Sequence, residues 1–140
     1  MTRKKILVLC TANSCRSQIA HGYLQYLGKK NVDVFSAGVE TKEVNLRAIS
    51  VMKEDGIDIS HHTSNHVNDF SHIAFDYVIT VCDDAKENCP YLPAIIKNIH
   101  QDFPDPAKAK GSEEEIMQQF RNVRNQIRDF SARFITELGQ

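Results

Sequence analysis

The sequence lacks the features that would place the protein in a membrane or against a nucleic acid. No apolar run approaches the roughly 18 residues that a membrane-spanning helix requires. Neither sign of charge is in excess, because 17 basic and 18 acidic residues leave a formal net charge of -1. Such a balance provides no overall field that would favour nucleic acid or an anionic membrane, so any bound anion must be held locally.

The chain also lacks internal repeats, low-complexity tracts and linkers that would divide it. Its hydrophobic content of 41% and charged content of 25% are those of an average soluble globular protein, which argues against a disordered or coiled-coil chain. We therefore expect residues 1–140 to form a single domain, and a monomer. The apolar run at residues 6–10 is too short for a secretion signal, so we expect a cytoplasmic protein.

Cysteine is scarce but informative. In a reducing cytoplasm, four cysteines indicate catalysis, redox sensing or metal binding more than structural disulfides. The C-x6-C spacing of Cys82 and Cys89 exceeds that of usual zinc ligand pairs, and the six histidines match no metal motif. We therefore expect no metal site, and we expect the histidines to be solvated surface residues.

Hydrophobic periodicity predicts strands that alternate with helices. Continuous aliphatic runs predict strands at residues 4–9, 32–35 and 76–81, and a fourth within 97–103. The small residues at 36–38 are expected to end the second strand. This order predicts a doubly wound α/β fold, a three-layer sandwich with a four-stranded parallel sheet, whose sites lie at the C-terminal ends of the strands.

Apolar residues at helical spacing predict the intervening helices. The first is expected over residues 17–27, with Gly28 as a C-terminal cap, and the second over residues 45–56. Ser112 and Glu115 form a capping box ahead of a long amphipathic helix.

Between the first predicted strand and helix, Cys10, Arg16 and Ser17 form the pattern C-x5-R-S. A loop of this length can wrap its backbone N–H groups around a tetrahedral oxyanion, beside the positive N-terminus of a helix. Arg16 can bind two anion oxygens, and the same donors would lower the pKa of the Cys10 thiol and make it a nucleophile. The predicted oxyanion-binding residues are Thr11, Ala12, Asn13, Ser14, Cys15, Arg16 and Ser17.

The alternative without a function is that Cys10 is a buried residue at the end of a strand. For Cys15 we keep this structural interpretation, because a second thiol in the loop has no required role. Cys82 and Cys89 lie seven positions apart, or about 10.5 Å along a helix, which is too far for a disulfide unless the segment unwinds. Taken alone, C-x5-R leaves a phosphatase and a reductase equally open.

Four motifs together resemble one family. CTANSCRS after a strand, SAG at 36–38, VITVCDDAKENCP at 78–90 and DPA at 105–107 resemble the thioredoxin-coupled arsenate reductases, which share the low-molecular-weight tyrosine phosphatase fold. The resemblance covers nearly the whole chain. It implies that arsenate is the substrate and that reduced thioredoxin is the electron donor, with no tightly bound cofactor.

The resemblance also implies roles for individual residues. Cys10 would attack arsenate, and Cys82 and then Cys89 would carry a disulfide away from it. Arg16 would bind the substrate, and Asp105 would donate a proton. The supporting residues would be Asn13, Ser17 and Ser36.

Three positions depart from the family's pattern. Ala12 stands where relatives commonly have glycine, so a positive φ there would cost roughly 1 kcal/mol. Some members bind potassium beside the loop through carboxylates together with Asn13, Ser36 and Thr63. This chain has His21 and Asn65 at matching positions, which disfavours a strong potassium site.

Two alternatives to an arsenate reductase remain open. A low-molecular-weight protein tyrosine phosphatase would leave Cys82 and Cys89 idle, and phosphatases of this fold usually carry an aromatic residue where this chain has Ala107. A redox or anion sensor would bind without turnover. We expect weak phosphatase activity in either enzyme, since the loop recognises a geometry common to phosphate and arsenate.

Overall fold

The computed structural model describes residues 3–82 and 91–139, in which four parallel strands form one sheet in the order β2-β1-β3-β4. The strands are β1 (Lys4–Cys10), β2 (Val32–Gly38), β3 (Tyr77–Thr80) and β4 (Lys97–His100). The helices are α1 (Arg16–Gly28), α2 (Leu46–Glu54) and α3 (Glu113–Leu138), with the 3-10 helices η1 (Lys29–Asn31), η2 (Val67–Phe70) and η3 (Pro106–Lys108). The predicted doubly wound α/β fold with a four-stranded parallel sheet is confirmed.

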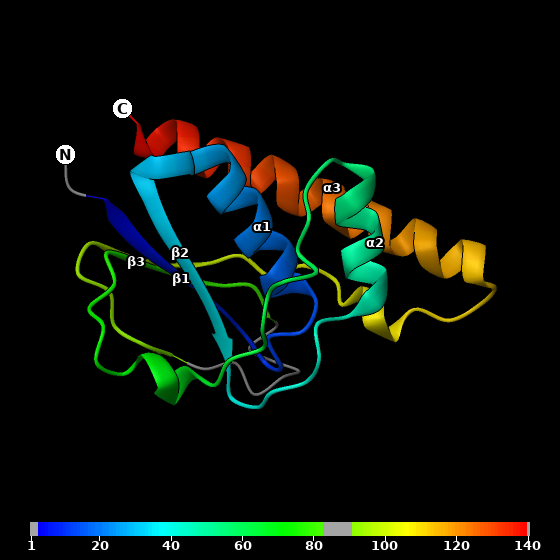
Figure 1. Ribbon diagram of the computed structural model, residues 1–140, viewed down its shortest axis with the longest axis horizontal. Helices are drawn as coiled ribbons and strands as arrows, with labels where there is room; N and C mark the ends of the chain where they lie inside the picture. The colour runs from blue at the N-terminus through cyan, green and yellow to red at the C-terminus, as the bar shows by residue number, and fades with distance from the viewer. Residues whose placement is uncertain (1–2, 83–90, 140) are drawn as a thin grey trace.

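The central strand β1 is buried on both faces, which explains its unbroken aliphatic run. Ile6 and Val8 belong to a core cluster that includes residues of all three α-helices, whereas Leu7 and Leu9 pack into a second cluster with residues from and around η2. Figure 1 shows α1 and α3 side by side over one face of the sheet, with α2 beyond them. In the described residues, η2 and its flanking loops cover the other face.

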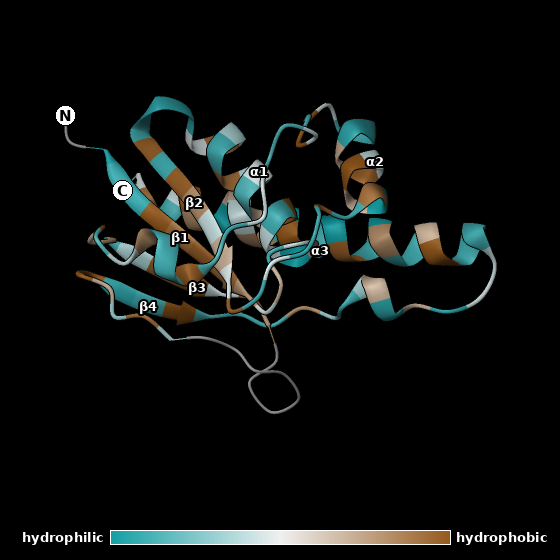
Figure 2. Ribbon diagram, turned by 60° about the horizontal axis from the view of Figure 1, so that its bottom comes forward, coloured by the Kyte–Doolittle hydropathy of each residue, from teal (hydrophilic) through white to brown (hydrophobic). Residues whose placement is uncertain are grey.

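The long helix α3 confirms the predicted capping box. Ser112 Oγ accepts a hydrogen bond from Glu115 N, and Ser112 N donates to Glu115 Oε1. Figure 2 shows hydrophobic and hydrophilic residues alternating along α3 and hydrophobic residues along most of β1. The buried residues of the α3 stripe are Phe120, Val123, Ile127, Phe130 and Phe134. This stripe joins α3 to the core beneath α1.

The prediction that the second strand ends before residue 36 is wrong. β2 continues to Gly38, which pairs with Cys10, while Ser36 pairs with Val8. These small residues are strand residues that let the loop after β1 pass close by. A Cβ on Gly38 would lie 2.5 Å from the carbonyl oxygen of Thr11.

The predicted cap at Gly28 is also wrong, because Lys29 takes the positive φ of 50° that follows α1. Gly28 is the last residue of the helix, and it is glycine for a packing reason. A Cβ there would lie 2.4 Å from Val32 Cγ2. The second helix ends at Glu54, two residues before Gly56, whose φ is 79°. Within the described residues, no helix has the length and apolar character needed to cross a membrane.

Candidate active site

Six of the eight residues of the C-x5-R-S pattern line a cavity of about 480 Å³ at the C-terminal end of β1, whereas Asn13 and Ser17 do not. The loop and the start of α1 supply one side of this cavity, and η3 with the residue before it supplies another. The lining residues are Cys10, Thr11, Ala12, Ser14, Cys15, Arg16, Glu40, Lys42, Asn45, Asp105, Ala107 and Lys108. The structure therefore brings together Cys10, Arg16 and Asp105, which lie up to 95 positions apart in the sequence.

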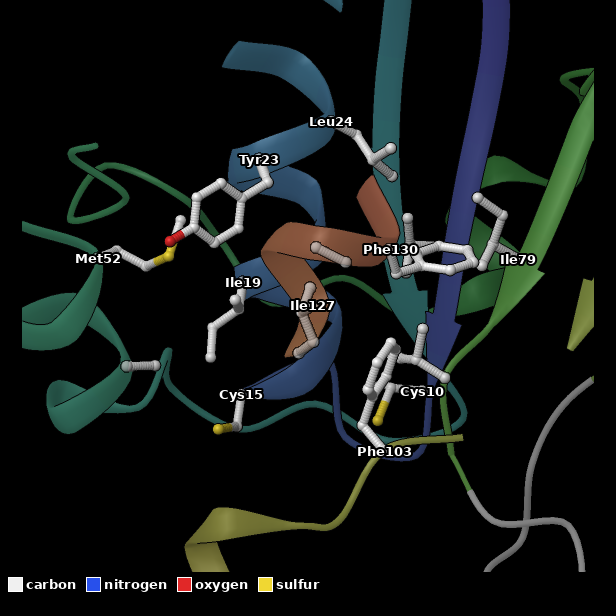
Figure 3. Packing of buried hydrophobic residues seen from close by; sticks show 14 of the residues in the cluster. Cys10, Cys15, Ile19, Tyr23, Leu24, Met52, Ile79, Phe103, Ile127 and Phe130 are labelled. Carbon is white, nitrogen blue, oxygen red and sulfur yellow. The ribbon is translucent and has the colours of Figure 1, made fainter. Parts of the chain in front are cut away.

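Cys10 is the last residue of β1 and is 4% exposed. Figure 3 shows it where β1 ends, with Cys15 at the start of α1, both within the core cluster that includes Phe103. The sulfur thus lies at the boundary between the apolar core and the anion loop. A side chain at this position is held by the strand that it ends and lines the cavity.

The carbonyl groups of the loop accept hydrogen bonds from the elements around it. The Thr11 oxygen accepts from the N–H groups of Val39 and Glu40, at 2.9 and 3.2 Å. The Ala12 oxygen accepts from Ser64 Oγ at 2.9 Å. Further along, the Asn13 oxygen accepts from Gln18 Nε2 at 3.0 Å, and the Ser14 oxygen accepts from Asn45 N at 2.9 Å.

These bonds determine where the loop's N–H groups point. In a trans peptide unit the C=O and the following N–H face opposite ways, and the described residues contain no cis peptide bond. The N–H groups that follow these four carbonyls therefore point away from the carbonyls' partners; they belong to Ala12, Asn13, Ser14 and Cys15, of which all but Asn13 line the cavity. Successive backbone N–H groups beside a helix N-terminus are an arrangement that suits an anion.

Asn13 occupies the turn of this loop and is fully buried. Its φ is 50°, in the left-handed region that asparagine tolerates better than most residues. Its Nδ2 donates to Ser17 Oγ at 2.8 Å, and its Oδ1 accepts from Asn65 N at 2.9 Å. Ala12 is not among the described residues with positive φ, so the strain considered for that position does not arise.

Arg16 reaches the cavity from the first turn of α1 and is 3% exposed. Its Nη1 donates to the carbonyl oxygen of Phe103 at 3.1 Å, and its Nη2 lies 3.7 Å from Asp105 Oδ2. Asp105 Oδ1 in turn accepts from Ala107 N at 3.0 Å, at the start of η3. The guanidinium is therefore held against the chain that follows β4, with its charge beside Cys10 and Asp105.

The second thiol of the loop differs in character from a nucleophile. Burial raises the pKa of the Cys15 thiol far above its usual range, and the negative charges of Asp105 and Cys10 raise it further against an opposing effect of Arg16. Cys15 is therefore a protonated thiol at neutral pH. This agrees with the interpretation that its side chain has no required role.

Cys82 lies two residues beyond the end of β3 and is fully buried. Its neighbour Val81 donates through its N–H to the carbonyl oxygen of Leu9 at 3.0 Å. Because β3 pairs directly with β1, Cys82, just beyond β3, and Cys10, at the end of β1, lie at the same edge of the sheet. Cys89 and most of the segment expected to carry the second disulfide lie outside the described residues.

The expectation that the histidines are solvated surface residues is wrong for two of them. His21 Nδ1 lies 2.8 Å from Ser36 Oγ, and the His21 ring stacks on that of His62 with centroids 4.4 Å apart. Burial, followed by the charges of His62 and His61, lowers the pKa of His21 to about 3. The imidazole is therefore neutral in the fold, where it lies partly buried behind the loop.

The potassium site found in some resembling proteins does not fit this arrangement. His21 fills one position with a neutral ring, and Asn65 directs its Nδ2 donor toward the carbonyl oxygens of Thr63 and Ser36, at 3.1 and 3.4 Å. Neither side chain offers the carboxylate that a hard cation prefers. Among residues 3–82 and 91–139, no group of three or more His, Cys, Asp or Glu side chains could hold a metal ion.

Sequence reasoning missed the side chains that shape the loop from outside it. Gln18 and Ser64 bind loop carbonyls, and Lys42 and Lys108 add positive charge to the cavity lining. No local pattern marks these residues, because their partners come from other elements. A glutamine on the inward face of the first turn of α1 is the one sequence feature that could have indicated a side chain supporting the loop.

Comparisons with known proteins agree with this geometry. Residues 5–140 match the low molecular weight phosphotyrosine protein phosphatase family. Arsenate reductase 1 of Staphylococcus epidermidis is 47% identical over 128 residues, covering 91% of this chain and 92% of that protein. An arsenate reductase of Bacillus licheniformis is 46% identical over the full length of both chains. The solved structure of an arsenate reductase in its oxidised state superposes with a TM-score of 0.79 at 32% identity, covering 96% of this chain and 98% of that one.

Proposed function

The chain belongs to the low molecular weight phosphotyrosine protein phosphatase family, and we propose that within it this protein is an arsenate reductase. The observation that carries the proposal is the pairing of an anion loop with a second cysteine: Cys10 ends β1, and the buried Cys82 follows the adjacent strand β3 at the same edge of the sheet. The loop places successive backbone N–H groups at one cavity that Cys10 and the buried Arg16 also line. Such a ring of donors fits a tetrahedral oxyanion and stabilises a thiolate beside it.

The first chemical step joins sulfur to arsenic. The Cys10 thiolate attacks arsenate, an S–As bond forms, and one oxygen leaves as water with a proton from Asp105. Arg16 neutralises the charge that gathers on the remaining oxygens. Arsenic is still in the +5 state after this step.

Electrons move in the second step. The Cys82 thiolate attacks the Cys10 sulfur, an S–S bond forms, and the electron pair of the S–As bond leaves with arsenic, which departs as arsenite in the +3 state. Cys89 then attacks Cys82 and releases Cys10 as a thiolate. Reduced thioredoxin converts the Cys82–Cys89 disulfide back to two thiols and is itself oxidised. We place this cycle in the cytoplasm, where it would detoxify arsenate.

Phosphate would follow a different course in the same cavity. Thiols do not reduce phosphorus, so a phosphate ester bound at Cys10 can only be hydrolysed, and Cys82 and Cys89 have no role in that reaction. The loop recognises oxyanion geometry, and we therefore expect phosphatase activity as a weak accompaniment. Ala107 lines the cavity with a methyl group only, which offers no flat face for an aromatic substrate.

A paired steady-state assay tests the proposal. Arsenate-dependent oxidation of NADPH, coupled through thioredoxin and thioredoxin reductase, is measured beside hydrolysis of para-nitrophenyl phosphate by the same preparation. We expect sustained arsenate turnover together with hydrolysis slower by at least about 10²-fold in kcat/KM, a difference of roughly 3 kcal/mol in transition-state stabilisation. Efficient hydrolysis without arsenate turnover would assign the chain to the phosphatases, and binding of arsenate without either reaction would make it a sensor.

A further inference from the structure

Gln18 is a fully buried amide that touches the anion loop from behind. It lies in the first turn of α1, and its Nε2 donates to the carbonyl oxygens of Asn13 and Thr63, both at 3.0 Å. These two oxygens belong to segments 50 positions apart. One side chain therefore ties the left-handed turn of the loop to the stretch that precedes η2.

The bond to Asn13 controls a donor in the cavity. The Asn13 carbonyl and the Ser14 N–H belong to one trans peptide unit, so fixing the oxygen outward fixes the hydrogen inward. The residue next to Thr63 has a matching function, since Ser64 Oγ holds the Ala12 carbonyl and thereby the Asn13 N–H. Asn65 N also binds Asn13 Oδ1 at 2.9 Å. The 63–65 segment thus supports two neighbouring peptide units of the loop. Gln18 binds both the loop, at Asn13, and this segment, at Thr63.

His62 determines which way the Gln18 amide faces. Both partners of Gln18 Nε2 are carbonyl oxygens, so this atom must be the NH2 group and Oε1 must lie on the opposite side. His62 Nδ1 lies 3.0 Å from Oε1, which can only accept. The proton of the neutral His62 ring is therefore on Nδ1, and this N–H holds the amide in the orientation that serves the loop.

The surroundings of His62 keep its ring neutral. Burial lowers the pKa of His62, the charge of His61 lowers it further, and Asp58 opposes both effects. The neutral His21 ring lies against the His62 ring, tilted by 32° with centroids 4.4 Å apart. Hydrogen bonding from His62 to Gln18 is thus a fixed part of the fold at neutral pH.

We propose that Gln18 is a positioning residue for oxyanion capture, and that His62 acts through it. The proposal rests on the proposed function, and it adds the residue that sets the direction of the Ser14 N–H. Without the amide, the Asn13 peptide is free to rotate, and the site loses one aligned donor toward both the bound oxyanion and the Cys10 thiolate. Gln18 itself does not touch the substrate.

Two measurements on reduced protein test this role without requiring turnover. Binding of inorganic phosphate is measured by calorimetry, and the pH profile of Cys10 alkylation by iodoacetamide is followed by peptide mass analysis. For Gln18→Leu, which keeps the volume and removes the donor, we expect the phosphate Kd to rise about 10- to 100-fold, as for loss of one hydrogen bond to a charged group. We also expect the alkylation midpoint to move toward higher pH.

Variants of His62 test the proposal even if Gln18→Leu does not fold, because they leave Gln18 in place. His62→Ala removes the donor to Oε1 and is expected to weaken phosphate binding in the same direction. His62→Asn can place an amide N–H near the position of Nδ1 and is expected to restore affinity. His72→Asn makes the same chemical change at an exposed position and serves as the matched control.

The outcomes separate this inference from the proposed function. Wild-type protein that binds phosphate and has a reactive Cys10 but never reduces arsenate would contradict the proposed function alone. Folded Gln18→Leu with wild-type phosphate affinity and a wild-type alkylation profile would overturn the role of Gln18. Equal phosphate affinities for His62→Ala and wild type would overturn the role of His62.

Discussion

At the scale of single residues, the candidate site depends on side chains that hold backbone groups in place. Asn13 takes a left-handed conformation that Asn tolerates, and its amide bonds to Ser17 and Asn65 keep it there. Arg16 is oriented by the Phe103 carbonyl before any anion binds. A site arranged in advance in this way needs little reorganisation when charge develops.

The partly buried His21 should give the stability of the protein a specific dependence on pH. Its pKa is about 3 in the fold against an ordinary value of 6.5, so below pH 6.5 the unfolded chain binds a proton that the folded chain excludes. Stability from this group is complete above pH 6.5 and is lost as pH falls toward 3, by about 1 kcal/mol per pH unit. Urea unfolding of wild type and His21→Asn at pH 7, 6 and 5 should give a smaller slope for the variant. Equal slopes would place the ring in solvent.

Residue identity alone predicted part of the site. Cys10 and Arg16 were predicted from the sequence because the loop's chemistry depends on their spacing, and the structure places them in one cavity. Gln18 could not be found in this way, because its partners lie 5, 44 and 45 positions away. The expectation for the histidines failed because burial of His21 depends on tertiary packing.

At the scale of elements, the loop is constrained by β2 as much as by α1. The strand runs on to Gly38, where the loop after β1 passes so close that a Cβ would lie 2.5 Å from the carbonyl oxygen of Thr11. Sequence periodicity ended this strand too early because small residues carry no hydrophobic signal. These small residues are required by contact with the loop. That contact cannot be predicted until the register of β1 and β2 is known.

We expect substitution of Gly38 to weaken anion binding by displacing the loop. A Cβ there would lie 2.5 Å from Thr11 O and 2.9 Å from both Asn13 N and Cys10 O, all of them backbone atoms. Gly38→Ala should therefore displace the loop, raise the phosphate Kd at least about tenfold and cost roughly 1–3 kcal/mol of stability.

Gly28→Ala is the matched control for this prediction. Its Cβ would meet Val32 Cγ2 at 2.4 Å, at the opposite end of α1 from the loop. This variant should lose comparable stability and keep wild-type phosphate affinity, as measured by thermal unfolding and calorimetry. Equal losses of affinity in the two variants would show that general destabilisation, and not displacement of the loop, weakens binding.

At the scale of the whole molecule, the strand order explains why distant cysteines can cooperate. β1 lies between β2 and β3, so the residues after β1 and β3 meet at one edge of the sheet. The alternation of strands and helices, read from hydrophobic patterns, was sufficient to predict a four-stranded parallel sheet with its sites at the C-terminal ends of the strands. The strand order, the exact strand ends and the packing behind the loop were not predicted, because they depend on contacts between elements.

The central claim is that arsenic(V) is reduced by electrons from protein thiols, beginning at Cys10. It is tested most directly by single-turnover chemistry of Cys89→Ser, reduced beforehand and mixed with arsenate. We expect about one arsenite per protein chain and a Cys10–Cys82 disulfide in the peptide map, because this variant cannot pass the disulfide onward. Sustained thioredoxin-coupled turnover by Cys89→Ser, or arsenite formation without that disulfide, would contradict the account.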